Sequence, residues 1–253
     1  MASDVLRKAI EKVRKSGRLR LTLSSDEIDR IGAGLRQRAI FSAKVANAGV
    51  LDGIRDVTER VLRGEISPLS ARERLRSVVE RSGYQPPVGK AGGIEDLSSD
   101  QRLDLIVRTN RDMARGYGRF ASAQKTLDEY PYWELYRAEP RQEPRDWVRR
   151  WAEAGGRTVD GRPMAPVNSG IWTRISRFGV PYPPFDFNSG MGVRRVSRRR
   201  VEGKARIPRQ TARDPLRFDR MKAEVPDDPR LARQLLEDLG DGYQITDGVV
   251  EAS

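Results

Sequence analysis

Apolar residues recur at three- and four-residue steps along most of the first 130 positions, the spacing of one helical face. This pattern predicts a helix over 4–15, which Gly17 ends. A second helical stretch starts at the capping-box sequence Ser24-Ser25-Asp26-Glu27 and continues to about residue 63. It forms either one long helix or two helices broken near Gly49.

Two further helices are marked by their caps. Ser67-Pro68 places a serine at the N-cap and a proline in the first helical turn, which predicts a helix that ends at Gly83. The stretch 84–93 holds two prolines and three glycines and reads as a linker. A second capping box, over 98–101, predicts a helix that continues to about residue 127.

The pattern changes after residue 131. Tyr132–Tyr136 alternates with aromatic and β-favouring residues and is the best strand candidate in the chain. Short helices are predicted over 144–154 and 169–178, with a hairpin-type turn at Asp160-Gly161 between them. We expect loop beyond residue 178, because the prolines there remove donors and favour extended backbone.

The aromatic residues gather in one region. Of 17 aromatic residues, 13 lie between Tyr117 and Phe187, and these include all four tryptophans. Large rings dominate buried area where they occur, so we place a compact core there. The predicted structural core consists of Trp133, Trp147, Trp151 and Trp172. The predicted fold class is α+β, mainly helical, with a long helical N-terminal arm, a small aromatic-rich α+β domain and an extended C-terminal tail.

Charge divides the chain further. The 253 residues carry a net charge of +12, with a pI near 10.3 and a mean hydropathy of −0.67, which points to an anionic partner. Residues 192–222 hold 12 Lys/Arg against 3 Asp/Glu, whereas 223–253 hold 2 Arg against 8 Asp/Glu. The predicted segments are a helical arm (1–90), an α+β domain (91–191), a basic extended segment (192–222) and an acidic tail (223–253). From 201 onward we expect extended chain, except for a short helix over 230–239.

Histidine and cysteine are both absent, which excludes Ser-His-Asp and Cys-His hydrolases, zinc fingers, haem proteins and disulfide frameworks. The lack of a long apolar run argues against a membrane span or a signal peptide, so we expect a soluble protein made in the cytoplasm. A catalytic carboxylate pair could come from Glu134, Glu139, Glu143 and Asp146. A solvated loop of Arg–Glu pairs is the favoured interpretation, and no catalytic residue, metal or cofactor is predicted.

The densest charge lies over Arg194–Arg200, where five guanidiniums occur in seven residues. Such a run repels itself unless an anion lies against it, and arginine forms forked contacts with phosphate. We therefore predict contact with nucleic-acid phosphates that does not read sequence. The predicted contact residues are Arg194, Arg195, Arg198, Arg199, Arg200, Lys204, Arg206 and Arg209. The alternatives are a solvated tail without a ligand and a segment that docks in an acidic protein groove.

Several stretches in a fixed order are similar to one family. They are Arg108-Thr109-Asn110, Ala114–Arg119, Tyr132–Leu135 and Phe178–Met191. Together they resemble the Mu F-like minor head, or head morphogenesis, proteins of tailed phages. The helical front over 41–84 is also similar to some of these proteins. Many members carry a histidine and a Cys-Arg-Cys cluster after the paired prolines, where this chain has Asp186–Ser189, so the role of that cluster is not transferred.

The resemblance implies a structural virion protein in a small number of copies, located in the head and assembled in the host cytoplasm. It implies partnership with portal and capsid proteins and with packaged double-stranded DNA, without a membrane and without enzymatic turnover. A second hypothesis is a sequence-nonspecific DNA-binding or packaging protein that acts through its basic C-terminal segment. A third is an enzyme that uses only Asp, Glu and Arg, such as a Mg²⁺ nuclease or a sugar-transfer enzyme. Deleting residues 192–253 would separate the first two hypotheses.

Overall fold

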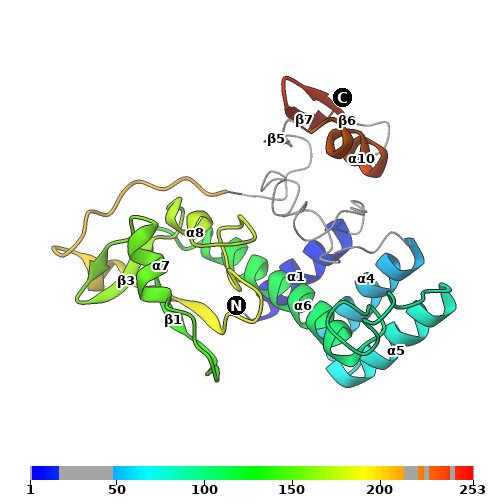
Figure 1. Ribbon diagram of the computed structural model, residues 1–253. Coiled ribbons are helices and arrows are strands. Elements are labelled where there is room, and N and C mark those ends of the chain that lie inside the picture. The colour runs from blue at the N-terminus through cyan, green and yellow to red at the C-terminus, as the bar shows by residue number, and fades with distance from the viewer. Residues whose placement is uncertain (1, 17–47, 214–221, 225–227, 240–242, 253) are drawn as a thin grey trace. The chain divides into compact units, whose positions relative to one another are not determined.

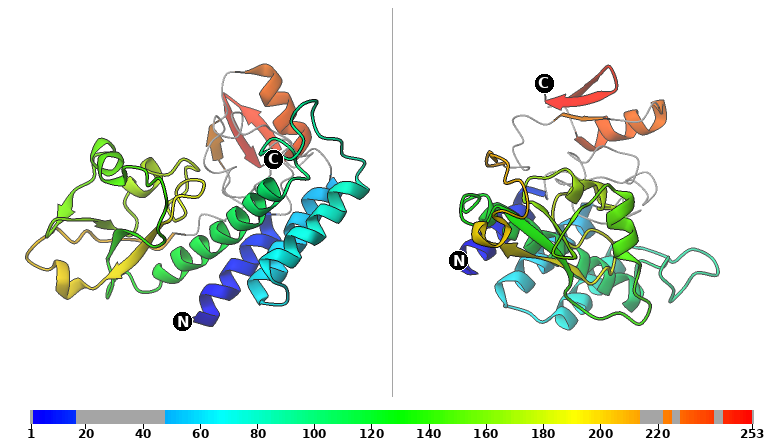
Figure 2. Two further views of the ribbon diagram at one scale, coloured as in Figure 1. Left: turned by 60° about the horizontal axis from the view of Figure 1, so that its bottom comes forward. Right: turned by 90° about the vertical axis from the view of Figure 1, so that its left-hand side faces the viewer.

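The computed structural model describes residues 2–16, 48–213, 222–224, 228–239 and 243–252 (Figures 1 and 2). The helices are α1 (Ala2–Ser16), α4 (Ala48–Arg63), α5 (Pro68–Arg81), α6 (Asp100–Ala123), α7 (Trp147–Glu153), α8 (Ile171–Arg174), α9 (Arg198–Val201) and α10 (Pro229–Leu239). The strands are β1 (Tyr132–Arg137), β2 (Thr158–Val159), β3 (Arg162–Pro166), β4 (Met191–Val196), β5 (Lys222–Glu224), β6 (Tyr243–Thr246) and β7 (Val249–Ala252). The predicted class, α+β and mainly helical, is confirmed.

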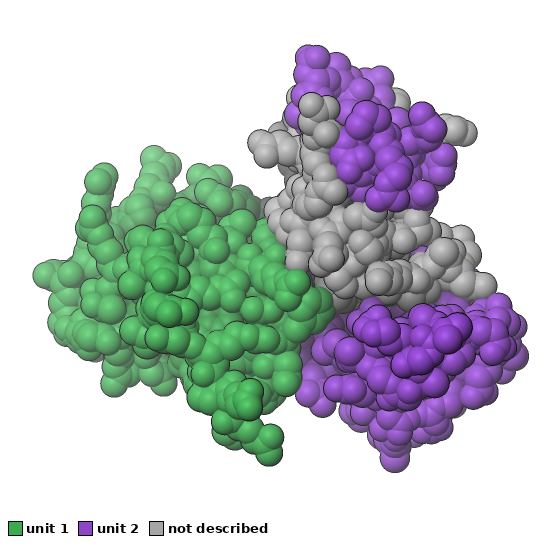
Figure 3. All heavy atoms as spheres, in the orientation of Figure 1, with its two compact units in different colours: residues 1–8, 115–215 green, residues 9–114, 216–253 purple. Residues whose placement is uncertain are grey.

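The chain forms two compact units, coloured separately in Figure 3. Unit 1 comprises residues 1–8 and 115–215, and unit 2 comprises residues 9–114 and 216–253. The two units are divided after residues 8, 114 and 215. The segment boundaries predicted at residues 91 and 192 do not coincide with these positions and stay predictions. The predicted helix that begins near residue 24 lies outside the described residues up to 47, and its last part is α4.

The helices of unit 2 pack through the apolar stripes that the sequence indicated. Residues of α4, α5 and the first part of α6 form one buried cluster, with Ile54, Leu75 and Leu103 fully buried. The cap predicted at Ser67 is present, since Ser67 Oγ accepts from Ser70 N at 3.1 Å. The capping box predicted over 98–101 is shifted by one residue, because Ser99 Oγ accepts from Arg102 N at 3.2 Å. The turn at residues 82–83 ends α5 as expected.

Unit 1 is built on a four-stranded antiparallel sheet in the order β2-β3-β1-β4. The predicted strand and hairpin are confirmed as β1 and as β2–β3 around Asp160-Gly161, where both residues have positive φ. The loop predicted beyond residue 178 is wrong at β4, which pairs with all six residues of β1. Gly192 and two arginines weaken the strand signal within this segment. The pairing that makes it a strand comes from β1, which lies about 55 residues earlier in the chain.

One face of this sheet and the C-terminal part of α6 enclose the aromatic core of unit 1. The structure buries all four tryptophans, and Trp172 and Trp133 are among the largest fully buried side chains. The Trp172 ring lies 5.7 Å from Trp133, 5.2 Å from Trp151 and 5.9 Å from Phe185 between centroids. Trp147 joins the cluster through Phe185, at 6.4 Å. Trp172 is therefore the centre of the ring network.

Gly116 in α6 explains how the loop 181–185 packs against this helix. A Cβ atom at Gly116 would lie 1.9 Å from the Pro183 carbonyl oxygen, so no other residue fits there without backbone movement. We expect Gly116→Ala to destabilise unit 1 by about 1–3 kcal/mol, the usual cost of overpacking. Urea unfolding followed by circular dichroism measures this loss. Gly93→Ala, whose Cβ would make only an ordinary 3.5 Å contact, is the matched control and should unfold like the parent protein.

The C-terminal part of the chain holds a second sheet and a helix. The helix predicted over 230–239 is confirmed as α10, which buries Leu231 and Leu235. Where the sequence suggested extended chain, β5, β7 and β6 form an antiparallel sheet in that order. Its hairpin turns at Asp247-Gly248, both at positive φ; Asp-Gly favours hairpin turns, and the prediction of extended chain overlooked it.

Candidate nucleic-acid interface

Glu134 lies at the centre of the basic surface of unit 1. It sits on β1, opposite Met164 of β3 and Arg194 of β4, and its side chain is only 4% exposed. Arg194 donates a hydrogen bond to Glu134 Oε1, and Arg162 NH1 lies 3.5 Å from the same oxygen. Arg200 NH2, from α9, lies 4.0 Å from Oε2. One buried carboxylate thus faces three guanidiniums from β3, β4 and α9.

This arrangement leaves positive charge at the surface. The three guanidinium side chains are between 42% and 49% exposed, and one carboxylate neutralises only one of them. Arg194 also lies over the Tyr136 ring, 5.4 Å from its centroid, which fixes the plane of its fork. Because Glu134 orients these guanidiniums and Tyr136 orients that of Arg194, the remaining N–H groups could bind a phosphate with little loss of side-chain entropy.

Electrostatics keeps Glu134 ionised. The hydrogen bond from Arg194 lowers the pKa of Glu134 below its ordinary value of 4.5 and outweighs the opposing effect of burial. Arg162 and Arg200 lower it further through their charges. Next to this cluster, Lys204 Nζ lies 2.7 Å from Asp160 Oδ2, and the hydrogen bond from Lys204 lowers the pKa of Asp160. Both carboxylates therefore stay charged at neutral pH and hold basic side chains at the surface.

The eight predicted contact residues do not form one continuous strip. Arg194 and Arg200 converge on Glu134, and Lys204 pairs with Asp160. Arg195 is one residue along β4 and therefore on its other face, where NH2 donates to Ser122 Oγ of α6 at 3.1 Å. Arg198 Nε donates to the Asp128 carbonyl at 2.7 Å.

Three of the predicted residues keep fully available guanidiniums. Arg199, Arg206 and Arg209 are exposed, and their side chains have no partner among the residues that the structure describes. Arg213, four residues beyond Arg209, is exposed as well and uses only its backbone N–H, which donates to Gln124 Oε1. The segment after α9 therefore presents cations that no carboxylate of this described part of the chain neutralises.

Two residues of the cluster around Glu134 were not predicted from the sequence to belong to a basic surface. The interpretation of Glu134 as part of a solvated Arg–Glu loop is wrong, because β1 places it inside the sheet between two neighbouring strands. The interpretation as a solvated Arg–Glu pair is correct for Glu139, which pairs with Arg141 at 2.7 Å on the surface. Arg162 is not among the predicted contact residues, although it directly follows the Asp160-Gly161 turn and begins β3. Strand pairing alone joins it to Glu134.

Removing Arg194 should destabilise unit 1, because the buried Glu134 carboxylate loses the shorter of its two hydrogen bonds and keeps only the long one from Arg162. We expect Arg194→Ala to lose about 1–3 kcal/mol of unfolding free energy at pH 7, measured by urea denaturation. Folding lowers the pKa of Glu134, so its stabilising effect is present above the ordinary pKa and is lost as pH falls through the lowered value. The difference between the two proteins should therefore shrink below about pH 4.

A second variant distinguishes this electrostatic cause from lost packing. Glu134→Gln combined with Arg194→Ala removes the buried charge, so it should be more stable than Arg194→Ala alone at pH 7. Arg199→Ala is the control and should leave stability unchanged, since its guanidinium has no partner in the described residues. A double variant that loses the sum of both single effects would contradict the assignment.

Neither a metal site nor a membrane-spanning helix is seen in the described part of the chain. No group of three or more Asp or Glu residues there could hold a metal ion. Among the same residues, no helix is both long and apolar enough to cross a membrane.

Two curated proteins are similar to part of this chain. The Mu-like prophage FluMu F protein of Haemophilus influenzae is 33% identical over 97 residues, which cover 38% of this chain and 23% of that protein. A protein F of Escherichia phage Mu, named for capsid assembly, is 32% identical over 107 residues, which cover 40% of this chain and 24% of that protein. The chain spans about a quarter of the length of these relatives.

No family model matches the chain, and no solved structure matches it. Both curated matches are F proteins of phage Mu or of a Mu-like prophage, the group of proteins that the motifs in the sequence resemble. Over about two fifths of its length, this chain is thus related to the Mu F-like proteins of tailed phages.

Proposed function

We propose that this chain is a structural minor head protein of a tailed-phage virion. It joins portal and capsid proteins during head assembly and contacts the phosphates of packaged double-stranded DNA. The observation that carries the proposal is the similarity to two F proteins, one of which is named for capsid assembly. The protein acts by contact and not by turnover.

The geometry of unit 1 supports contact with DNA. Three arginines held by one buried carboxylate, next to exposed cations after α9, present forked donors to a row of phosphates. Nothing in this arrangement resembles a helix placed to read bases, so the contact is directed at the backbone and is independent of sequence. The face thus suits DNA packed at high density, where no particular sequence is presented.

Head assembly can be tested in the phage or prophage that encodes the chain. Mass spectrometry of purified, DNA-filled heads should find the protein, and deletion of its gene should remove most filled heads from a lysate. Electron microscopy of the deletion lysate counts filled and empty heads directly. Filled heads at the normal yield, without the protein, would contradict the proposal.

The alternative is a DNA-binding or packaging protein that acts through the basic segment alone. Its test requires a different truncation from the deletion of residues 192–253 that the sequence suggests. Deleting residues 192–253 would remove β4 and the fully buried Val201, and would unfold unit 1. Truncation after Pro215 keeps unit 1 whole. If the truncated protein binds DNA but no longer joins heads, the C-terminal part is the docking element, which favours the head protein. If it still joins heads, docking resides elsewhere in the chain.

A further inference from the structure

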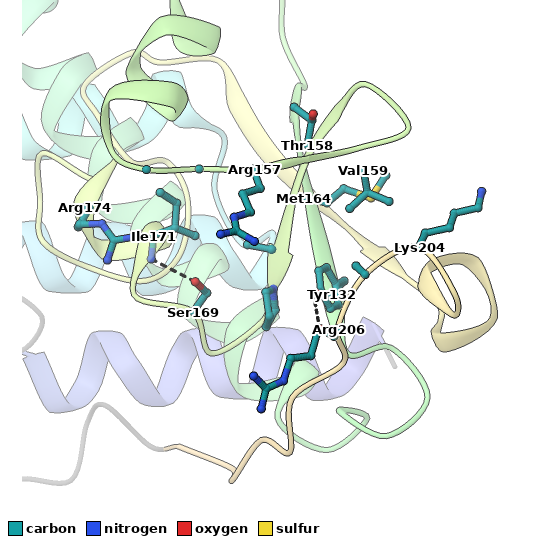
Figure 4. A pocket seen from close by; sticks show the side chains of 15 residues that line it. Tyr132, Arg157, Thr158, Val159, Met164, Ser169, Ile171, Arg174, Lys204 and Arg206 are labelled. Carbon is teal, nitrogen blue, oxygen red and sulfur yellow. Dashed lines mark hydrogen bonds between the residues drawn. The ribbon is translucent and has the colours of Figure 1, made fainter.

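A cavity of about 540 Å³ opens on unit 1 beside the basic surface (Figure 4). Its walls come from the loop 155–158, the outer edge of β3, the start and end of α8, and the segment 204–206. Tyr132 Oη donates to the Arg206 carbonyl at 2.7 Å and so ties this last segment across the sheet. The cavity has the size of small-molecule sites, which typically measure roughly 300–1,000 Å³.

The lining is strongly cationic. Four of its residues carry positive charge and none carries negative charge; the cations are Arg157, Arg174, Lys204 and Arg206. Lys204 pairs with Asp160 and extends away from the other labelled side chains in Figure 4. Arg174 uses Nε on the Ala154 carbonyl at 2.9 Å, which orients its fork. The side chains of Arg157 and Arg206 have no partner within the described residues. The pocket therefore favours an anion.

Another part of the wall is apolar, although Thr158 and Ser169 also line the cavity with hydroxyl groups. Tyr132, Met164 and Ile171 are buried and line the cavity, and Val159 adds a further apolar side chain. A bare inorganic ion would leave this wall in contact with water. A ligand that fits both parts has an anionic group for the guanidinium forks and a planar or apolar body for the wall.

We propose that this pocket binds a phosphate ester of the nucleotide class. Arg157, Arg174 and Arg206 hold the phosphate, and the wall of Tyr132, Met164 and Ile171 receives the base. The ligand is either a free nucleotide or an unpaired nucleotide of a DNA strand, since both offer the same chemistry. The pocket is a separate site from the cluster around Glu134, so it does not depend on the proposed function.

Calorimetric titration of the full chain tests the proposal with deoxyadenosine monophosphate as the probe. We expect saturable binding that weakens about tenfold or more for deoxyadenosine, which lacks the phosphate, and for inorganic phosphate, which lacks the base. The double variant Arg157→Ala, Arg206→Ala should lose about tenfold or more in affinity for the nucleotide. Arg119→Ala with Arg149→Ala, two exposed arginines of the same unit outside the pocket, is the charge-matched control and should bind normally.

Three results would overturn the proposal: no saturable binding, inorganic phosphate bound as tightly as the nucleotide, or equal loss of affinity in both double variants. Competition by a 5′-phosphorylated single-stranded hexanucleotide identifies the source. Displacement of the mononucleotide supports a DNA strand as ligand, and failure to displace it supports a free nucleotide. Arg199→Ala with Arg209→Ala and Arg213→Ala should retain nucleotide binding, which separates this site from DNA contact by the basic segment.

Discussion

Replacing Trp172 by alanine should unfold unit 1 under conditions in which the parent protein is folded. The ring is fully buried and lies within 6 Å of three other aromatic rings, so its removal leaves a cavity at the centre of the core. Such losses cost about 3–5 kcal/mol, a large share of the roughly 5–15 kcal/mol that stabilises a domain. Thermal unfolding followed by near-ultraviolet circular dichroism, which reports on packed indoles, measures the effect.

The effect should be confined to unit 1. Hydrogen exchange in α4 and α5 should stay slow, because their core contains no residue of the aromatic cluster. Val148→Ala is the matched control on neighbouring α7: its side chain is 72% exposed, so its removal should leave stability within about 0.5 kcal/mol of the parent value. Retention of the near-ultraviolet spectrum in Trp172→Ala would show that the rings do not form the core.

DNA binding should depend steeply on salt, and this dependence should become weaker when the unpartnered arginines are removed. If about six phosphates are neutralised, the log–log slope of affinity against salt is about −5, or roughly a thousandfold weakening between 50 and 200 mM salt. The triple variant Arg199→Ala, Arg209→Ala, Arg213→Ala should flatten this slope by about 3 and weaken unrelated duplexes equally. Fluorescence anisotropy at several salt concentrations measures both quantities.

The control must carry the same change in net charge. Arg74→Ala, Arg81→Ala and Arg119→Ala together remove three exposed cations outside the basic segment, and their side chains lack partners in the described residues. This variant should keep the slope near the parent value. If the first triple variant keeps its DNA affinity and slope but fails to join phage heads, the basic segment docks on an acidic protein surface and does not bind DNA.

Much of the local structure could be predicted from the sequence. The cap at Ser67, the strand over β1 and the turn at Asp160-Gly161 depend on residues that are neighbours along the chain. Their signals are therefore complete in short windows of sequence. The same holds for α10, whose apolar residues repeat with the helical period.

The strand β4 and the site around Glu134 could not be predicted in this way. In isolation, Met191–Val196 is a short stretch interrupted by a glycine and two arginines, and its strand geometry depends on six pairs with β1. Glu134 looks like a surface residue until pairing brings β3 and β4 to either side of it. Burial of its charge is then offset by three guanidiniums, which three separate segments place beside it: Arg162, Arg194 and Arg200.

The sequence by itself determined the helical periodicity, the aromatic core composition, the excess of positive charge and the resemblance to the Mu F-like proteins. Tertiary structure alone decided which cations share one surface, because alternation along β4 sends Arg194 and Arg195 to opposite faces. It also decided which carboxylate is buried and where the cavity opens. These properties depend on contacts between segments far apart in the chain, and no local pattern of residues records them.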